Sequence, residues 1–451
     1  MLVSFSVENF MSYKECQTFS MIAGKQTRHG DHILEVKGKR LLKGSFFFGA
    51  NAAGKSNLFF AIKFAKNIVM NGLRKNVLTN KHFRIDQEYS NRPGVFQFDI
   101  CSNGHFYSYG FAISYIKGII EEEWLHQCDS AEIVIFERSI EDGQSIITTG
   151  FNFSDKENRQ KFDIFSDNVP DDKLFLSEIA ERKLTEQNDF SAYKNVKSWF
   201  SDLLILTPKS RYVNKAKMLL EDKNAESLID LLRDFDTGIE NITLKNEKME
   251  DVLDFLPREV KEALIQDIEE SFNDTDDGEE VEEVGISIAG RSIRFKKDGN
   301  QIFASQLLMS HGNNDDPFQL ADESDGTQRL FDLIPIYQAG KQSRVIFIDE
   351  LDRSFHTKLV VKYIEQFYQA TFGTESQLIA SVHDSNVMDL SLLRQDEIWF
   401  VERQPDHSSK IYSLNRFQAR FDKKVAKDYL LGRYGAIPCF SQLDVTEMGE
   451  D

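Results

Sequence analysis

The chain has 451 residues, of which 41% are hydrophobic and 12% aromatic, and this composition excludes disorder throughout and predicts two or three domains with well-filled cores. The net charge of -19, from 54 basic and 73 acidic residues, disfavours a protein whose main surface coats nucleic acid, although a local basic groove stays open. The four cysteines are widely spaced, no apolar run approaches the ~18 residues of a membrane helix, and the sequence has no signal-peptide pattern. We therefore predict a soluble protein of the reducing cytoplasm that does not act at a membrane.

The first 72 residues predict a strand, a second strand and a helix. Apolar and polar residues alternate from Leu2 to Phe10, and the apolar run 44–49 ends at a glycine. From Ser56 onward, apolar residues recur at helical spacing as far as Asn71 and Gly72. The second strand, its glycine-rich turn and the helix therefore form one unit.

The turn of this unit reads Gly49-Ala-Asn-Ala-Ala-Gly-Lys-Ser56, which satisfies the pattern GxxxxGK[ST] in the strand-to-helix context that the pattern requires. In such a P-loop, backbone N–H groups at a helix N-terminus approach phosphate oxygens. Lys55 would reach the β and γ phosphates, and the Ser56 hydroxyl would ligate Mg²⁺. The residues predicted to bind ATP are Asn51, Ala52, Gly54, Lys55, Ser56 and Asn57. The alternative is a glycine turn with a solvated lysine.

The middle of the chain changes pattern twice. Residues 94–150 alternate, with Asn-Gly and Asp-Gly turn signals, and predict an antiparallel sheet. The pattern becomes helical over 172–204 and 214–272, and the acidic residues 273–283 predict a flexible loop. We therefore predict a head that a helical insertion interrupts, with boundaries at 1–205, 206–305 and 306–451.

Two later strands end in groups that can carry chemistry. The apolar run from Arg344 ends in Asp349 and Glu350, and the run from Ser376 ends at His383. Two adjacent carboxylates need a cation if they are buried, and ligands of open α/β sheets sit at such strand ends. In a P-loop NTPase, Asp349 would hold Mg²⁺ and Glu350 would polarise the attacking water. His383 would hydrogen-bond the γ-phosphate, although a lone histidine is more often structural.

Between these features, Glu323-Ser-Asp-Gly-Thr-Gln-Arg-Leu330 opens an apolar helical pattern. The order of P-loop, serine-glycine segment, Asp349-Glu350 and His383 resembles that of ABC-type ATPase heads, a superfamily that includes the SMC and RecF proteins. This resemblance implies that Ser324, Gly326 and Thr327 are the signature that binds ATP on a second subunit, and that Asp352 is the D-loop residue.

The signature departs from the transporter consensus LSGGQ. Asp325 adds an acid that should weaken or retune closure over a γ-phosphate. Taken alone, Ser324 would be a helix N-cap. The family's glutamine loop has only weak candidates, Gln87 and Gln97.

A closer resemblance covers most of the chain. Six segments are similar to the AAA-type ATP-binding proteins of bacterial abortive-infection systems. This family includes the ATPase subunits of the PARIS and septu phage-defence operons and has relatives among the OLD ATPases. The six segments are Phe96–Ile100, Glu123–Leu125, Leu174–Ser177, Glu323–Thr327, Asp396–Glu402 and Tyr429–Pro438. The length suits the PARIS subunit best. The resemblance implies an ATPase that senses infection, through a phage-encoded trigger, and holds or activates a separate toxic effector, commonly a nuclease.

These observations predict an α/β protein, a three-layer ABC-type P-loop ATPase head with an antiparallel β subdomain and a helical insertion. We expect a homodimer or higher homo-oligomer with ATP and Mg²⁺ at each interface, because P-loop and signature face opposite ways in one head. A RecF- or SMC-like DNA-repair ATPase is the alternative, which the acidic charge disfavours. Only 68 residues follow His383 and no second catalytic cluster is visible, so we expect no nuclease within this sequence; His29-Gly-Asp-His32 is too isolated to predict a metal site.

Overall fold

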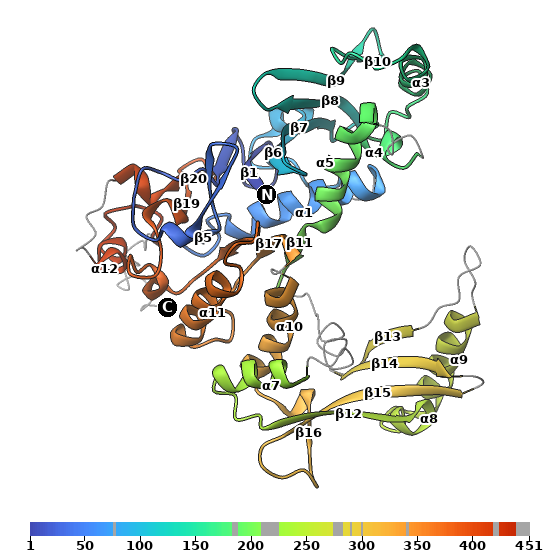
Figure 1. Ribbon diagram of the computed structural model, residues 1–451, viewed down its shortest axis with the longest axis vertical. Coiled ribbons are helices and arrows are strands. Elements are labelled where there is room, and N and C mark those ends of the chain that lie inside the picture. The colour runs from blue at the N-terminus through green and yellow to red at the C-terminus, as the bar shows by residue number, and fades with distance from the viewer. Residues whose placement is uncertain are drawn as a thin grey trace, which may run out of the picture. The chain divides into compact units, whose positions relative to one another are not determined.

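The computed structural model describes residues 1–74, 78–182, 188–208, 225–273, 283–288, 291–298, 301–339, 342–417 and 424–438 (Figure 1). Its contacts divide the chain into two compact units. The first comprises Met1–Pro208, Gly340–Asp352 and Tyr363–Asp451, and the second comprises Lys209–Ala339 and Arg353–Lys362. The second unit begins near the predicted start of the insertion at 206 but continues to Ala339, beyond the predicted end at 305.

The first unit contains a mostly parallel sheet of six strands. Its order is β11 (Leu204–Leu206), β17 (Val345–Ile348), β18 (Gln377–Ser381), β5 (Gly44–Phe48), β19 (Ile398–Arg403) and β20 (Ser409–Ser413). Only the edge strand β20 runs antiparallel to its neighbour. Strands β5, β17 and β18 are buried over their whole length, which confirms the prediction from their continuous apolar runs.

A second sheet of the first unit has seven antiparallel strands. Its order is β10 (Gln144–Thr148), β9 (Glu132–Glu141), β8 (Ile119–Cys128), β7 (His105–Ser114), β6 (Gly94–Ser102), β1 (Leu2–Glu8) and β2 (Gln17–Ser20). Three of the four hairpin connections in this sheet lie at the turn signals predicted between 94 and 150, whereas the connection between β8 and β9 had no such signal. The strands β3 (Ile33–Val36) and β4 (Lys39–Leu42) form a separate ribbon.

Helix α1 (Lys55–Asn71) packs against both sheets of the first unit. Its Phe59 ring contacts Phe47 and Phe347 of the parallel sheet at centroid distances of 6.1 and 5.9 Å. Its Phe64 ring lies 5.5 Å from Phe96 of the antiparallel sheet. Each buried phenylalanine contributes about 1.5–3 kcal/mol, so the helix joins the two sheets into one core. The layered α/β architecture predicted from the sequence is confirmed in this unit.

The first unit has further helices and short turns. They include α3 (Lys156–Ser166), α4 (Phe175–Ala180), α5 (Ser191–Asp202) and α12 (Val425–Leu430), and α11 (Thr357–Ala370) crosses from the second unit into the first. Short 3₁₀ turns are η1 (Gly30–His32), η2 (Gln87–Asn91), η4 (Asn188–Phe190), η7 (Ser385–Val387), η8 (Gln395–Glu397) and η9 (Leu414–Phe417). In the described part of the chain, no helix is long and apolar enough to cross a membrane.

A buried carboxylate holds α4 on the antiparallel sheet. Glu123 on β8 accepts hydrogen bonds from the backbone N–H groups of Phe175 and Leu176 at 2.6 and 3.0 Å. Tyr109 donates a third bond, at 3.0 Å, to the same carboxylate. Burial raises the pKa of Glu123 to about 7, although Arg138 and these donors oppose the shift. Two of the segments that resemble the abortive-infection family therefore contact each other here.

The second unit combines helices with an antiparallel sheet that we did not predict. The sheet has the order β12 (Asn241–Lys248), β15 (Gln301–Ser310), β14 (Arg291–Asp298) and β13 (Glu283–Ile288), and β16 (Phe318–Gln319) pairs with β15. The helical segments are α7 (Ala225–Asp234), α8 (Met249–Val252), α9 (Arg258–Asn273), α10 (Asp325–Ala339) and the turn η5 (Leu320–Asp322). The insertion is thus helical only in part.

Strand β12 corrects the prediction of a helical pattern over 214–272. It pairs with β15 along all of its residues, from Asn241 opposite Ser310 to Lys248 opposite Phe303. Pairing with a distant strand overrides a weak local preference, so the helical pattern was misleading there. The acidic residues 274–282 lie outside the described part of the chain, and the loop expected there stays a prediction.

Candidate functional site

The predicted P-loop lies between β5 and α1, as its sequence context required. Gly54 caps the start of α1 with φ at 109°, a conformation that a side chain would strain. Asn51 and Ala52 lie at the exposed tip of the loop, and Ser56 is half-buried in the first turn of the helix. The loop therefore presents backbone N–H groups and a hydroxyl at a helix N-terminus.

A serine network holds the loop from behind. The Ser409 hydroxyl donates its one hydrogen to the Ala53 carbonyl at 2.6 Å, and its oxygen lies 2.7 Å from the Ser12 hydroxyl. Asn57 donates its side-chain amide to the same Ser12 oxygen at 2.7 Å. Asn57, which we predicted to bind ATP, is thus engaged within the fold, and neither serine was predicted to take part.

A C-terminal segment supports the first residues of the loop. The Ala50 N–H donates to the Ala436 carbonyl at 2.9 Å, and the Tyr429 hydroxyl donates to the same carbonyl at 2.9 Å. The Ala436 N–H donates to Glu402 at 3.1 Å. Two further segments of the abortive-infection resemblance, Asp396–Glu402 and Tyr429–Pro438, therefore meet beside the P-loop. This role was missed because Ala436 and Glu402 lie more than 350 positions along the chain from the first residues of the loop that they support.

The Lys55 side chain is folded over its own loop. Its ammonium donates to the carbonyls of Gly49 and Ala50 at 2.7 and 3.2 Å, and the residue is only 5% exposed. Burial lowers the pKa of Lys55, whereas the charges of Asp349, Asp352 and Glu350 raise it. These three acids are therefore close enough to act electrostatically on the lysine, and the structure brings the predicted cation and carboxylates together.

The predicted acidic pair lies just after β17. Asp349 is 1% exposed, and its Oδ1 accepts a 2.6 Å hydrogen bond from the Ser381 hydroxyl. The same hydroxyl accepts a 2.8 Å bond from the Glu350 N–H. Glu350 has φ at 55°, an uncommon conformation that turns the chain sharply after the strand. Ser381, at the end of the neighbouring strand β18, was not predicted.

His383 and Asp352 complete this edge of the sheet. The His383 Nε2 atom lies 3.9 Å from a carboxylate oxygen of Glu350. The Asp352 carboxylate accepts hydrogen bonds from the backbone N–H groups of His383 and Asp384, each at 2.7 Å. The residue expected in the D-loop thus orients the His383 loop within its own chain.

The donors at this edge suit a hard divalent cation. Mg²⁺ prefers oxygen ligands and is held in proteins by one or two carboxylates or hydroxyls together with phosphates. The Asp349 carboxylate is buried, where an uncompensated charge is costly, and the half-buried Ser56 hydroxyl opens the adjacent helix. These residues therefore fit the predicted magnesium and triphosphate.

The signature segment belongs to the second unit. The Ser324 hydroxyl accepts from the Thr327 N–H at 3.1 Å and lies 2.9 Å from the Thr327 hydroxyl, so Ser324 caps α10. Ser324 is exposed, whereas Thr327 is buried. A Cβ atom on Gly326 would lie 2.9 Å from the Ser354 carbonyl, and only glycine fits there without displacement. Ser324 therefore caps the helix and is at the same time exposed to solvent.

The acid before the signature has a partner. Glu323 is hydrogen-bonded to His311 at 2.8 Å, and this bond raises the pKa of the histidine. The two glutamine-loop candidates are placed elsewhere in the first unit. Gln97 donates its amide to Asp99 and Ser108 within the antiparallel sheet, and Gln87 is exposed in η2. In the described part of the chain, neither glutamine forms a hydrogen bond with the P-loop.

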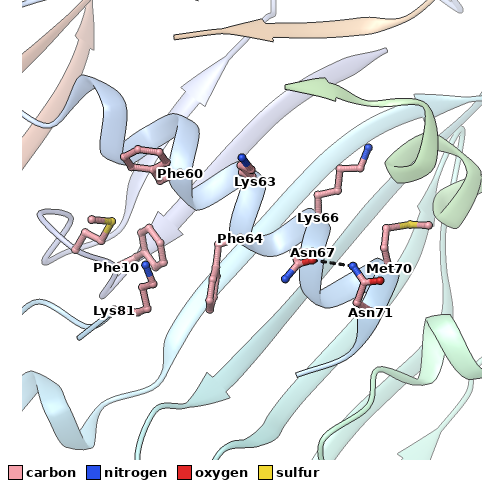
Figure 2. A pocket seen from close by; sticks show the side chains of 10 residues that line it. Phe10, Phe60, Lys63, Phe64, Lys66, Asn67, Met70, Asn71 and Lys81 are labelled. Carbon is pink, nitrogen blue, oxygen red and sulfur yellow. Dashed lines mark hydrogen bonds between the residues drawn. The ribbon is translucent and has the colours of Figure 1, made fainter. Parts of the chain in front are cut away.

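A further pocket lies along α1 and differs chemically from the P-loop (Figure 2). Its volume is about 610 Å³, and its described lining has aromatic, methionine, asparagine and lysine side chains without an acid. Figure 2 shows Phe60 and Phe64 on the helix and the hydrogen bond from Asn71 to Asn67, at 2.7 Å.

Comparison with known proteins gives one family match. Residues 45–389 match the model of a family described as "AAA domain, putative AbiEii toxin, Type IV TA system". The matched range includes the P-loop, the signature segment, Asp349, Glu350 and His383. No curated protein matches the chain.

Among solved structures, two SMC heads are similar to the chain. One is described as the SMC head bound to the C-winged helix domain of ScpA, with 13% identity, a TM-score of 0.36, and coverage of 93% of this chain and 99% of the other. The second is the SMC head domain from Thermotoga maritima, with 11% identity, a TM-score of 0.39, and coverage of 91% and 98%. Similarity at this level carries no argument about activity.

Proposed function

The chain belongs to the family of AAA domains described as the putative AbiEii toxin of type IV toxin–antitoxin systems, and from this premise we propose that it hydrolyses ATP to control a separate toxic effector. One observation carries the enzymatic part of the proposal. The buried Lys55 ammonium lies within electrostatic reach of Asp349 and Glu350, which come from a strand almost 300 residues away in the sequence. This proximity supports the proposal, because a P-loop ATPase needs its lysine and its carboxylates at one site.

The chain's own residues have distinct tasks in this reaction. Lys55 would leave its loop carbonyls and pair with the β and γ phosphates, and Ser56 with Asp349 would hold Mg²⁺, which neutralises phosphate charge when bound. Glu350 would orient the attacking water and accept its proton. His383, 3.9 Å from Glu350, would donate to the γ-phosphate oxygen. Ser381 would keep both acids in position.

The signature segment supports a homodimer or a higher homo-oligomer. Ser324 is exposed at the N-terminus of the 15-residue helix α10, where N–H groups and the helix dipole favour an anion. In the proposed assembly, Ser324 and Gly326 of one copy cover the triphosphate on the P-loop of another. ATP binding would close the interface and hydrolysis would open it.

The finer role rests on the resemblance to abortive-infection ATPases and on charge. A net charge of -19 suits a scaffold that holds a protein partner better than one that coats DNA. We propose that the nucleotide state sequesters, releases or activates a separate effector, a nuclease, in response to a phage-encoded trigger, as in the PARIS systems. The description of the family supports a link to toxin–antitoxin function.

The enzymatic proposal is tested with purified wild type, Lys55→Ala and Glu350→Gln. We expect turnover to fall roughly 10²–10³-fold in both variants, because each loses a group that acts on the transferred phosphoryl. Lys55→Ala should also lose ATP affinity. Glu350→Gln should still bind ATP and should accumulate as an oligomer whose mass is at least twice the 52.0 kDa of one chain. Unchanged turnover in both variants would discard the active-site assignment.

Mixing two inactive variants tests whether the site is shared. A chain with Lys55→Ala keeps its signature, and a chain with Ser324→Arg keeps its P-loop. Half of the dimers in an equal mixture combine the two, and each has one intact site, so about a quarter of wild-type turnover should return. No recovery would show that the signature does not act across an interface.

Two further measurements distinguish the proposed control of an effector from the alternative role in DNA repair. A partner protein that co-purifies from the native operon and dissociates on addition of ATP or an infection trigger supports the scaffold role. A partnerless assembly whose DNA affinity falls steeply with salt would favour the RecF- or SMC-like repair ATPase instead.

A further inference from the structure

The segment His29–His32 gathers three metal-binding side chains in the first unit. His29, Asp31 and His32 each offer a ligand atom, and these atoms lie within 4.8 Å of one another. The turn η1 produces this arrangement by folding three residues tightly after His29. His32 is buried, His29 is half-buried and Asp31 is exposed, so the cluster opens to solvent on one side.

Both histidines have a ring nitrogen already occupied by an acceptor. His32 Nδ1 lies 3.1 Å from each oxygen of the Glu397 carboxylate, and His29 Nε2 lies 3.0 Å from the Leu390 carbonyl. A carbonyl or a carboxylate can only accept, so these two nitrogens carry protons. In the neutral rings, His29 Nδ1 and His32 Nε2 therefore present lone pairs.

This arrangement is the one that metal-binding histidines use. A ligating histidine almost always donates its other N–H to a carboxylate or a backbone carbonyl, which fixes the tautomer and the ring orientation. Glu397 is itself held by the Tyr368 hydroxyl at 2.9 Å and by the Arg394 N–H at 2.8 Å. The His32 ring also stacks on Tyr368 with centroids 3.5 Å apart. The supporting groups are therefore rigid before any ion binds.

We propose that His29, Asp31 and His32 bind a divalent transition-metal ion of the zinc class, with the fourth position open to water. Two imidazoles and one carboxylate suit zinc, whereas Mg²⁺ prefers oxygen ligands alone. Zinc lies about 2.0–2.1 Å from its nitrogen ligands, which places tetrahedral ligand atoms about 3.3 Å apart, so atoms that are now up to 4.8 Å apart must approach one another by about 1.5 Å. Rotation of the exposed Asp31 side chain provides part of that adjustment, and the His29 ring, which stacks on His32 with centroids 4.8 Å apart, must tilt about its bond to the Leu390 carbonyl to provide the rest.

The ion would stabilise one side of the head. Glu397, which orients His32, ends η8 directly before β19, and β19 pairs with β5, the strand that leads into the P-loop. A bound ion would link the segment around η1 to this sheet, because it ties His29 and Asp31 to the buried His32. The expected consequence is higher thermal stability of the full chain.

The test uses the full chain, stripped with a chelator and titrated with zinc chloride. Excess Mg²⁺ and no nucleotide are present, so that oxygen-only sites such as Asp349 do not contribute. The variants are His29→Gln and Asp31→Asn, whose side chains are not buried. The matched control is His126→Gln. The two ring nitrogens of His126 lie 2.9 Å from the carboxylates of Glu132 and Glu137, so neither nitrogen is free to bind a metal ion.

We expect one zinc per wild-type chain and a rise in its melting temperature. Each variant should weaken binding roughly 10–100-fold or more and lose the rise, and the control should behave like wild type. Cobalt in place of zinc should give visible absorption bands of low-coordinate nitrogen and oxygen ligation, absent from both variants. Equal zinc affinity in all four proteins, or no binding by wild type, would overturn the proposal.

Discussion

The two halves of the proposed ATP site are built differently. The P-loop edge, in the first unit, is held by contacts within one chain: Ser12 and Ser409 behind the loop, Ala436 beside it and Ser381 beneath the acids. The signature segment, in the second unit, is an exposed helix start that Ser324 and Thr327 cap between themselves. The first half is preorganised, and the second is accessible to another molecule.

This difference teaches what each half requires. Groups that must hold a cation and a phosphate at fixed positions need a rigid shell of secondary contacts. A segment that meets its ligand only on association must be exposed and still stable alone, and a self-capped helix satisfies both conditions. Substitutions at the P-loop edge should therefore affect chemistry within one chain, whereas those at the signature should affect mainly closure.

Among the residues that support the site without acting on the phosphates, the largest effect is expected from Ser381→Ala. The Ser381 hydroxyl donates to Asp349 and accepts from the Glu350 N–H, so its loss leaves the two acids without their common support. We expect ATP turnover to fall roughly 10–100-fold while the chain stays folded. The exposed Ser391→Ala is the control and should retain full turnover. If Ser381→Ala also retained it, the claim of preorganisation would fail.

Next in size is the support given by the C-terminal segment. Gly435 has φ at 71°, and a Cβ there would collide with Glu402 and Tyr412. We expect Gly435→Ala to lower the free energy of unfolding by about 1–3 kcal/mol and to weaken ATP binding. Gly143 is the matched control, since its φ is 78° and a Cβ would meet nothing within 4 Å. Equal losses in both variants would show backbone strain alone, without support of the loop.

A smaller effect is expected at the signature cap. Ser324→Ala removes the acceptor for the Thr327 N–H and should cost about 1 kcal/mol of stability, measured by denaturant unfolding. ATP affinity of the isolated chain should not change, because the P-loop is held by other residues. Thr327→Val keeps the bond from its N–H to Ser324 and is the control. A large loss of ATP affinity in Ser324→Ala would contradict the separation of the two halves.

The smallest effect is a dependence on pH near the signature. The hydrogen bond to Glu323 raises the pKa of His311, so the charged pair stabilises the folded chain below pH 6.5, and this contribution is lost as pH rises through the raised pKa. The pair is partly exposed, so the change should stay below about 1 kcal/mol. Melting curves of wild type and His311→Asn between pH 5.5 and about 8.5 should diverge at the acid end only.

The motif residues were predictable because their chemistry is local. The spacing of Gly54, Lys55 and Ser56 specifies a loop whose geometry depends on few other residues, and Asp349-Glu350 follows a strand readable from its own apolar run. Ser12, Ser381 and Ala436 carry no such signal, since serine and alanine are common everywhere. Their roles appear only when segments far apart in the chain meet.

The secondary structure of the insertion was the other feature that the sequence did not predict correctly. Strand β12 is stabilised by pairing with β15, more than 50 residues away, and local pattern does not report such a partner. The sequence by itself determined the α/β class, the antiparallel sheet, the P-loop and the acidic pair, because these follow from period, turn chemistry and short motifs. Tertiary structure alone decided which residues hold the loop, and that Leu390 and Glu397 orient the rings of His29 and His32. Contacts between distant segments depend on the packing of the whole chain, and no local window contains that information.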